Sequence, residues 1–281
     1  MKFLLFFAKR FIAGENLEDA IHVTRKLNKI DIKTTIDFLG EHSHTREEVK
    51  KNLENYFKLI RAINILKLDS NISIKLTSLG LDISKDYCID NLKKLLKYGK
   101  KYQVMITIDM ESSKYTSFTI AVYKKFIKMY NNTEIAIQCN LRRTNKDIKN
   151  LINKKPNIRL VKGAYIEHSK DYIQNKHIVN DKYIKYLRLL FKTNSFVAIA
   201  THDTKIINYA REYINKNKIK KKRYEFQMLY GIRQDIQKQL ADENYPIRVY
   251  IPYGKNWLPY YIRRMREQKE IFFFVLKHLF R

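Results

Sequence analysis

Short runs rich in isoleucine, valine and threonine recur along the chain, and longer stretches with apolar residues at helical spacing separate them. Alternation with period two and a high content of β-branched residues are typical of half-buried strands. We therefore predict eight strands, at 34–41, 72–79, 104–110, 134–139, 158–165, 197–202, 224–230 and 246–252. The segments between them, such as DNLKKLLKYGKKY and DKYIKYLRLLF, have the apolar spacing of amphipathic helices.

Strands that alternate with helices in this way are typical of an α/β protein with a (β/α)8 TIM-type barrel. The alternative is a doubly wound open sheet, which usually carries a glycine-rich nucleotide-binding turn after a strand. The chain has only seven glycines and contains neither GxGxxG nor GxxxxGK. We therefore favour a single barrel domain over residues 1–281, with a helical N-terminal segment at 1–33 and the barrel and C-terminal helices at 34–281.

One alternate set of strand residues is apolar and is expected to pack on the helices, and the other set is unusually polar for a barrel interior. The polar set comprises Lys75, Thr77, Thr107, Asp109, Gln138, Arg159, His202, Glu225, Gln227, Arg248 and Tyr250. Burying such groups without partners costs about 1–3 kcal/mol each, so they must satisfy one another or hold a ligand. Most of them lie toward the C-terminal ends of their strands, where barrel enzymes place their active sites. A buried salt-bridge network without chemistry is the alternative.

The composition is that of a globular chain, with 45% hydrophobic and 30% charged residues, a mean hydropathy of −0.46 and no apolar run long enough to span a bilayer. The apolar run in the N-terminal stretch MKFLLFFAKRF is too short for the core of a signal peptide, and we expect a cytoplasmic protein. Cys88 and Cys139 form neither a metal motif nor a disulfide framework, and a reducing compartment suits both. We expect no metal site.

The charge is strongly basic, with 56 lysines and arginines against 28 acidic residues and a net charge of +28. Such an excess suits nucleic acid or an anionic membrane surface. The lysines are spread along the whole chain, however, and only the stretch NKNKIKKKRYE is a dense run. Zinc-finger, RNP-type and basic-zipper patterns are absent from the sequence, so we do not expect nucleic-acid binding. A non-catalytic basic barrel that binds RNA or a membrane stays as the alternative function.

Eight motifs occur in order: SIKLTSLGLD, TIDME, IQCNLRR, RLVKGAY, IATHD, EFQMLYG, RVYIPYG and YYIRRMRE. Together they resemble the motif series of the proline dehydrogenase family, over nearly the whole chain and in its short, monofunctional form. The resemblance implies an FAD-dependent barrel enzyme that oxidises L-proline to Δ1-pyrroline-5-carboxylate. The aldehyde dehydrogenase domain of the fused bifunctional enzymes has no counterpart in this sequence.

The resemblance implies that Arg263 and Arg264, in the stretch WLPYYIRRMREQ, hold the substrate carboxylate, with Lys75 as a third cation. A guanidinium group presents a fixed fork of donors that matches a carboxylate. Neighbours on a helix differ by about 100°, so two adjacent arginines can approach one anion from different sides. Glu267 lies three and four residues further on, where it can orient both guanidinium groups.

The resemblance further implies that Tyr250 packs on the proline ring, with Leu160 as a weaker candidate. Asp109 matches the carboxylate that the family treats as catalytic, and we interpret it as an electrostatic partner of the cations and the substrate amine. Arg159 is implied to lie near flavin N5, the atom that accepts the hydride from proline C5. The amine must be neutral for hydride to leave, because a protonated nitrogen has no lone pair with which to form the imine.

Residues implied to contact FAD lie on or just beyond four consecutive strands. They are Met110, Gln138, Arg159, Lys162, Gly163, Ala164, Thr201 and His202. Reduced flavin in this family passes its electrons to a membrane quinone. The apolar C-terminal stretch EIFFFVLKHLFR could therefore make peripheral contact with the inner face of the membrane, although packing of this stretch on the barrel is the favoured interpretation.

Overall fold

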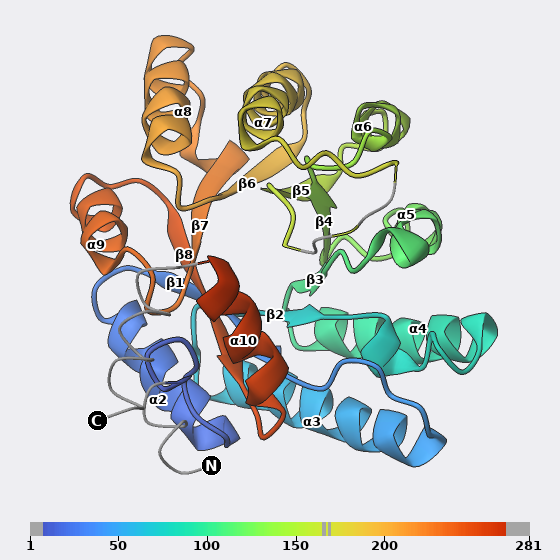
Figure 1. The fold of residues 1–281 in the computed structure, drawn as a ribbon. Helices are drawn as coiled ribbons and strands as arrows, with labels where there is room; N and C mark the ends of the chain where they lie inside the picture. The colour runs from blue at the N-terminus through green and yellow to red at the C-terminus, as the bar shows by residue number, and fades with distance from the viewer. Residues whose placement is uncertain (1–7, 165–166, 168–169, 268–281) are drawn as a thin grey trace, which may run out of the picture.

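The computed structural model describes residues 8–164, 167 and 170–267, except for the side chains of Arg266 and Glu267. Within these residues, eight parallel strands close into a barrel in which each strand pairs with its neighbours in chain order (Figure 1). The strands are β1 (Lys33–Phe38), β2 (Ser70–Ile74), β3 (Ile106–Ile108), β4 (Thr133–Gln138), β5 (Asn157–Val161), β6 (Phe196–Ala200), β7 (Tyr224–Leu229) and β8 (Ile247–Tyr253). The closed barrel confirms the predicted TIM-type fold.

A helix follows each strand, and all of these helices except the last, which lies inside their ring in this view, surround the barrel (Figure 1). They are α3 (Arg46–Ile65), α4 (Lys85–Lys101), α5 (Ser113–Phe126), α6 (Thr144–Ile152), α7 (Lys176–Phe191), α8 (Thr204–Lys216), α9 (Gln234–Asp242) and α10 (Trp257–Glu267). The N-terminal helix α2 (Leu17–Asn28) precedes β1. It packs against β1 and β8, where a buried Thr34 hydroxyl donates to Thr24, so α2 occupies a place in the outer ring between α9 and α3 (Figure 1). Among the described residues, no helix combines the length and the apolar character needed to cross a bilayer.

Several strands are shorter at their C-terminal ends than the sequence pattern predicts. β2 ends at Ile74 rather than residue 79, and Thr77–Leu79 form a 3-10 turn, η1. β3 ends at Ile108 and β5 at Val161. The predicted strands were too long because apolar and polar residues still alternate in the sequence after the strands have ended. At these positions the backbone already forms loops at the C-terminal face of the barrel.

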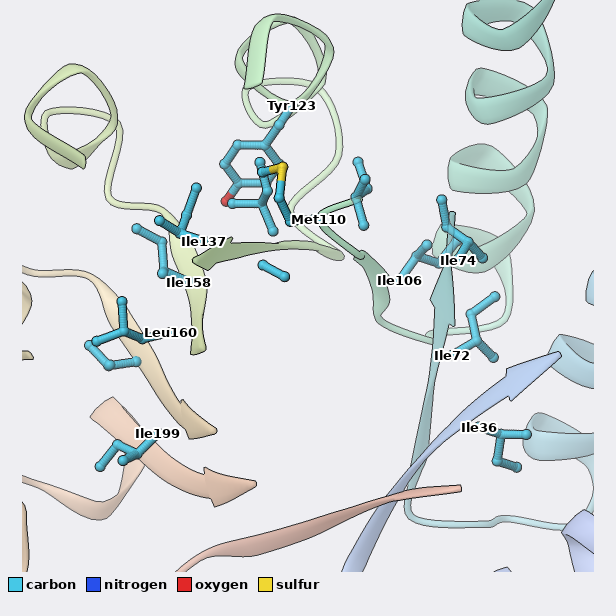
Figure 2. Packing of buried hydrophobic residues seen from close by; sticks show 14 of the residues in the cluster. Ile36, Ile72, Ile74, Ile106, Met110, Tyr123, Ile137, Ile158, Leu160 and Ile199 are labelled. Carbon is cyan, nitrogen blue, oxygen red and sulfur yellow. The ribbon is translucent and has the colours of Figure 1, made fainter. Parts of the chain in front are cut away.

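The main hydrophobic core is the shell between the strands and the helices, shown in part in Figure 2. The predicted apolar strand set is confirmed there, since Ile72, Ile74, Ile106 and Ile108 are completely buried. Burial of side chains of this size stabilises the fold by about 1.5–3 kcal/mol each.

A second, smaller hydrophobic cluster joins the N-terminal segment to α10. It contains Ala8, Phe11, Ile12, Leu39, Ile232, Trp257, Tyr260, Tyr261 and Met265. The indole Nε1 of Trp257 also donates to Glu15 Oε1 at 3.0 Å. The helix that carries Arg263 and Arg264 is therefore held in part by residues from the start of the chain.

Candidate active site

Asp109, directly after β3, is the point at which side chains from several strands meet inside the barrel. Its Oδ1 accepts hydrogen bonds from Ser73 Oγ at 2.7 Å and Arg159 Nη1 at 2.7 Å. Its Oδ2 accepts from Tyr250 OH at 2.8 Å and Lys75 Nζ at 3.3 Å. Burial raises the pKa of Asp109, but the Lys75 and Arg159 cations outweigh it, so the net pKa lies below its usual value. The carboxylate is therefore ionised and held on both oxygens.

Lys75 connects Asp109 to two carboxylates that sequence reasoning missed. Its Nζ donates to Asp37 Oδ2 at 3.0 Å and lies 3.6 Å from Glu41 Oε1. Burial lowers the pKa of Lys75, but Asp37, Tyr250 and Asp109 together raise it well above its ordinary value. Lys75 is thus a permanent cation among three carboxylates.

Of the missed carboxylates, Asp37 has a signal in the sequence. Asp37 follows Ile36, one of the apolar shell residues, so the period-two rule already assigns it to the barrel interior. Asp37 is 1% exposed. Glu41 and Glu111 lie in loops beyond the strands, and no alternation rule applies to them. Glu111 accepts from the Thr77 hydroxyl at 2.5 Å and the Thr77 amide at 3.2 Å, so Thr77 serves the loop rather than the barrel interior.

Arg159 on β5 has its guanidinium group inside the barrel, and only 4% of the residue is exposed. Besides Asp109, Nη1 donates to Ser73 Oγ at 3.0 Å and Nη2 donates to Thr107 Oγ1 at 3.2 Å. Nη2 also lies 3.5 Å from Glu134 Oε1. The guanidinium carbon lies 5.4 Å from the centre of the Tyr250 ring, a cation–π contact. Arg159 therefore contacts Tyr250 and Asp109, the two residues that the family resemblance assigned to the proline ring and the substrate amine.

Below Arg159, the remaining polar residues of the predicted set satisfy one another. Arg248 Nε donates to Glu225 Oε1 at 2.6 Å, and Gln227 Nε2 donates to the same oxygen at 2.7 Å. Burial raises the pKa of Glu225, but Arg248 lowers it more, so the net pKa is below its usual value. Burial raises the pKa of Glu134 and Arg159 only partly offsets it, so the net shift is upward. This layer matches the salt-bridge network considered as an alternative, whereas the side chain of Asp109 is 13% exposed.

Helix α10 brings its first arginine to the rim of the site. Arg263 Nη2 donates to Glu41 Oε1 at 2.7 Å, and Nη1 donates to Glu41 Oε2 at 3.3 Å, which is a two-point ion pair. Glu41 thus lies between Arg263 and Lys75, two of the cations predicted to bind a substrate carboxylate. Arg264 is 6% exposed, and its guanidinium carbon lies 5.2 Å from the Tyr260 ring centre. The side chain of Glu267 lies outside the described residues, so its predicted role stays a prediction.

The loops after β5 and β6 lie side by side because these strands are paired. Lys162 Nζ donates to Asp203 Oδ2 at 2.6 Å, which joins the two loops. His202 Nε2 accepts from the Leu229 amide at 2.9 Å, so the imidazole proton is on Nδ1. Burial, together with the Arg264, Arg233 and Lys162 cations, lowers the pKa of His202 to about 4. His202 is therefore neutral at physiological pH.

Gly163 adopts a φ of +115°, and a Cβ added there would lie 2.1 Å from Asn140 Nδ2. Only glycine fits this left-handed position so close to the side chain that follows β4. Thr201, which is buried, accepts from the Asp203 amide at 3.2 Å, and Ala164 is exposed. These loop residues thus present backbone and small side chains on one segment of the rim.

Gln138, Met110 and Leu160 are all buried. Gln138, at the end of β4, is buried and donates through Nε2 to the Glu111 carbonyl at 3.3 Å. Met110 and Leu160 belong to the hydrophobic shell between strands and helices, where Figure 2 labels both together with Tyr123. Their side chains therefore pack in the shell, and a flavin contact of Met110 would have to use its backbone.

The predicted site residues form two arcs of the barrel rim. Those assigned to the substrate lie in β8, in α10 and directly after β2 and β3, and most of those assigned to the cofactor lie in β4, β5 and β6 and the loops that follow them. The hydrogen bond between Arg159 and Asp109 joins the two arcs. No group of three or more metal-ligating side chains occurs among the described residues.

We compared the chain with known protein families and known proteins. The proline dehydrogenase family model matches residues 20–275. The chain belongs to the proline dehydrogenase family. It is 38% identical to proline dehydrogenase 1 of Bacillus subtilis subsp. natto, over 96% of this chain and 89% of that protein. It is 34% identical to the proline dehydrogenase of Deinococcus radiodurans, over 92% of this chain and 86% of that protein.

Solved structures of larger proteins share the fold of this proline dehydrogenase family member. Proline utilization A from Bdellovibrio bacteriovorus, inactivated by N-propargylglycine, matches with a TM-score of 0.85 and 26% identity, over 92% of this chain and 32% of that chain. Proline utilization A from Corynebacterium freiburgense matches with a TM-score of 0.82 and 17% identity, over 94% of this chain and 31% of that chain, which shows the fold alone. The chain thus spans about a third of these solved proteins.

Proposed function

We propose that this protein oxidises L-proline to Δ1-pyrroline-5-carboxylate, with FAD as its cofactor and a quinone as electron acceptor. The observation that carries the proposal is the junction of the two rim arcs, where Arg159 contacts both Asp109 and Tyr250. Family membership supplies the reaction class, and the junction supplies a place where substrate and cofactor would meet.

The chemistry of one arc fits a flavin dinucleotide. Arg159 and Lys162 offer positive charge, Gln138 offers an amide, and Gly163 holds its backbone in a conformation that leaves no room for a Cβ. Thr201 and the neutral His202 lie at the end of the next strand. Together these residues would hold the isoalloxazine edge and the dinucleotide portion. FAD, when bound, accepts the hydride that proline loses.

The other arc suits a small amino acid with a carboxylate. Arg263, Arg264 and Lys75 supply the positive charge, and Tyr250 offers a ring face. In this structure Glu41 forms the two-point ion pair with the Arg263 guanidinium group, and its Oε1 lies 3.6 Å from Lys75 Nζ. A substrate carboxylate would compete with Glu41 for these cations, so Glu41 prevents them from being left without an anion before the substrate arrives.

Asp109 and the surrounding cations set the protonation of the bound amine. Oxidation removes two electrons and two protons from the ring nitrogen and C5, and the nitrogen must already be neutral when the hydride leaves. The cations Lys75, Arg159 and Arg263 disfavour a protonated amine nearby, and the carboxylates of Asp37, Glu41 and Asp109 oppose this effect. Asp109 has a lowered pKa and is therefore a weak proton acceptor, so its proposed role is to balance the cations and orient the amine.

The decisive experiment is a flavin spectrum of the purified protein before and after anaerobic addition of L-proline. Oxidised-flavin absorption that bleaches with L-proline and recovers with a soluble quinone is the expected result. A colourless protein that takes up no added FAD would overturn the proposal and favour the non-catalytic basic barrel. The stretch 270–281, considered for membrane contact, lies outside the described residues, and vesicle binding with and without this stretch tests that part separately.

The need for a neutral amine predicts a pH dependence. Catalytic efficiency should rise with pH from mildly acidic to alkaline conditions, until the group that limits the reaction is deprotonated. The measurement is kcat/KM for L-proline with an artificial acceptor across this range. A flat profile of the flavin-reduction rate itself would contradict an amine-limited step.

A further inference from the structure

The guanidinium group of Arg159 is held by a chain of buried side chains that begins at β1. Arg248 on β8 donates through Nη1 to the Thr34 carbonyl at 2.6 Å and through Nε to Glu225 at 2.6 Å. Gln227, two residues along β7, donates to Glu225 and accepts from Arg159 Nε at 2.6 Å. Each of these four residues is at most 6% exposed. The chain therefore ties Arg159 to three strands without help from solvent.

Charged groups on both sides fix the direction of the Gln227 amide. An amide donates from one end and accepts at the other. The Glu225 carboxylate accepts, so it selects the amide nitrogen, and the Arg159 Nε–H donates, so it selects the amide oxygen. The reversed amide would place two acceptors together at Glu225 and two donors together at Arg159. Glu225 stays ionised because Arg248 outweighs the effect of burial on its pKa.

Gln227 restricts rotation of the Arg159 guanidinium plane, which the other hydrogen-bond partners of Arg159 do not restrict. Asp109, Ser73 and Thr107 all accept from the terminal Nη groups. Among the hydrogen bonds of the described residues, only the bond to Gln227 reaches Nε. Without it, the guanidinium plane could pivot about its terminal contacts while the ion pair with Asp109 persisted.

We infer that Gln227, oriented by Glu225, is a positioning residue that fixes the plane of the Arg159 guanidinium group where the two rim arcs meet, and so sets the rate of proline oxidation rather than the affinity for proline. The inference rests on the proposed function for its kinetic part. The proposed function assigns proline binding to α10, Lys75 and Tyr250, whereas the two side-chain hydrogen bonds of Gln227 go to Glu225 and Arg159.

The test compares Gln227→Met with Gln227→Glu. Methionine keeps the volume and loses both hydrogen bonds, so the limiting rate of anaerobic flavin reduction should fall about tenfold or more. The dissociation constant of L-proline from the same titration should change less than about twofold. Burial and Glu225 favour a protonated glutamic acid at 227 against the opposing effect of the Arg159 cation, and in that form its OH and C=O replace the amide NH2 and C=O. Gln227→Glu should therefore keep the rate within about threefold of wild type.

Gln237→Met is the matched control. Gln237 on α9 is 3% exposed and donates to the Leu229 and Ile232 carbonyls at 3.0 and 2.8 Å, with no hydrogen bond to Arg159 among the described residues. Its loss should lower the melting temperature as the loss of any buried amide does, and leave the limiting rate within about twofold. An equal rate loss in Gln227→Met and Gln237→Met would overturn the inference, as would an unchanged rate in Gln227→Met.

A second measurement does not depend on catalysis. In protein labelled with ¹⁵N-arginine, the Arg159 Nε–H signal is identified by its absence in Arg159→Lys. Its exchange with water should be at least about tenfold faster in Gln227→Met and unchanged in Gln237→Met. Unchanged exchange in Gln227→Met would refute the positioning role. If wild-type flavin is not reduced by proline, the proposed function fails, and the exchange comparison still decides whether Gln227 positions Arg159.

Discussion

At the scale of single residues, two of the cations assigned to substrate binding already form ion pairs with carboxylates of the protein. Arg263 is paired with Glu41, and Lys75 is surrounded by Asp37, Glu41 and Asp109. Removing one member of a buried pair leaves the other uncompensated, so each variant perturbs its partner as well. Functional tests at these positions therefore need to separate substrate binding from stability.

Replacing Arg263 or Arg264 with methionine should weaken proline binding while the flavin spectrum stays near wild type. Hydrogen bonds to charged groups contribute about 1.5–3 kcal/mol each, so the apparent affinity should fall roughly ten- to a hundredfold. Lysine at either position should restore only part of it, because an ammonium group keeps the charge and loses the fork. The measurement is the Michaelis constant for L-proline with an artificial acceptor, with the exposed Lys255→Met as control. Unchanged Michaelis constants in both single variants would refute the carboxylate role.

The lowered pKa of His202 predicts that stability depends on pH. In the folded protein His202 takes up a proton only near pH 4, whereas in the unfolded chain it does so near pH 6.5. Stability is therefore lost as pH falls from 6.5 toward 4, by about 2 kcal/mol at pH 5. His202→Gln should lose less stability than wild type between pH 7.5 and pH 5, measured by urea unfolding. An imidazole signal of His202 that titrates near pH 6.5 would contradict this prediction.

At the scale of elements, the sequence pattern predicted all eight strands, because strand alternation is a local signal. It also placed Arg159, Asp109 and Tyr250 together in the barrel interior. It did not predict the contact between the N-terminal segment and α10, which joins residues more than two hundred positions apart, and no local periodicity encodes such a contact. The ion pair between Glu41 and Arg263 was missed for the same reason.

The attachment of α10 depends on Gly231, in the turn after β7. Gly231 has a φ of +76°, and an added Cβ would lie 1.6 Å from the Arg10 carbonyl oxygen. Gly231→Ala should therefore displace the N-terminal segment, cost about 2 kcal/mol or more and raise the Michaelis constant for proline, because α10 carries Arg263. Gly254→Ala is the control, since its φ is +126° but the nearest atoms lie at 3.4 Å. Equal losses in the two variants would show that backbone strain alone, and not the collision with Arg10, sets the cost.

At the scale of the whole molecule, the buried charges nearly balance and the excess lies outside the core. Among the described residues, the buried basic side chains are Lys75, Arg159, Arg248 and Arg264, and the buried acidic ones are Asp37, Glu111, Glu134, Asp147 and Glu225. The excess that gives the net charge of +28 is therefore carried by residues outside this buried set. Such an excess repels itself in the compact state and is open to screening by salt.

Moderate salt should consequently stabilise this protein. Raising sodium chloride from about 0.02 M to about 0.2 M shortens the screening length from about 20 Å to about 7 Å, which weakens repulsion between exposed lysines and leaves the buried pairs almost unaffected. The melting temperature should rise by a few degrees in a thermal scan. Lys220, Lys221 and Lys222 are exposed, and reversing all three to glutamate lowers the net charge from +28 to +22. This triple variant should melt higher than wild type at low salt and respond less to added salt, because less repulsion is left to screen. A melting temperature that falls with salt in wild type would mean instead that attractive surface ion pairs outweigh the net charge.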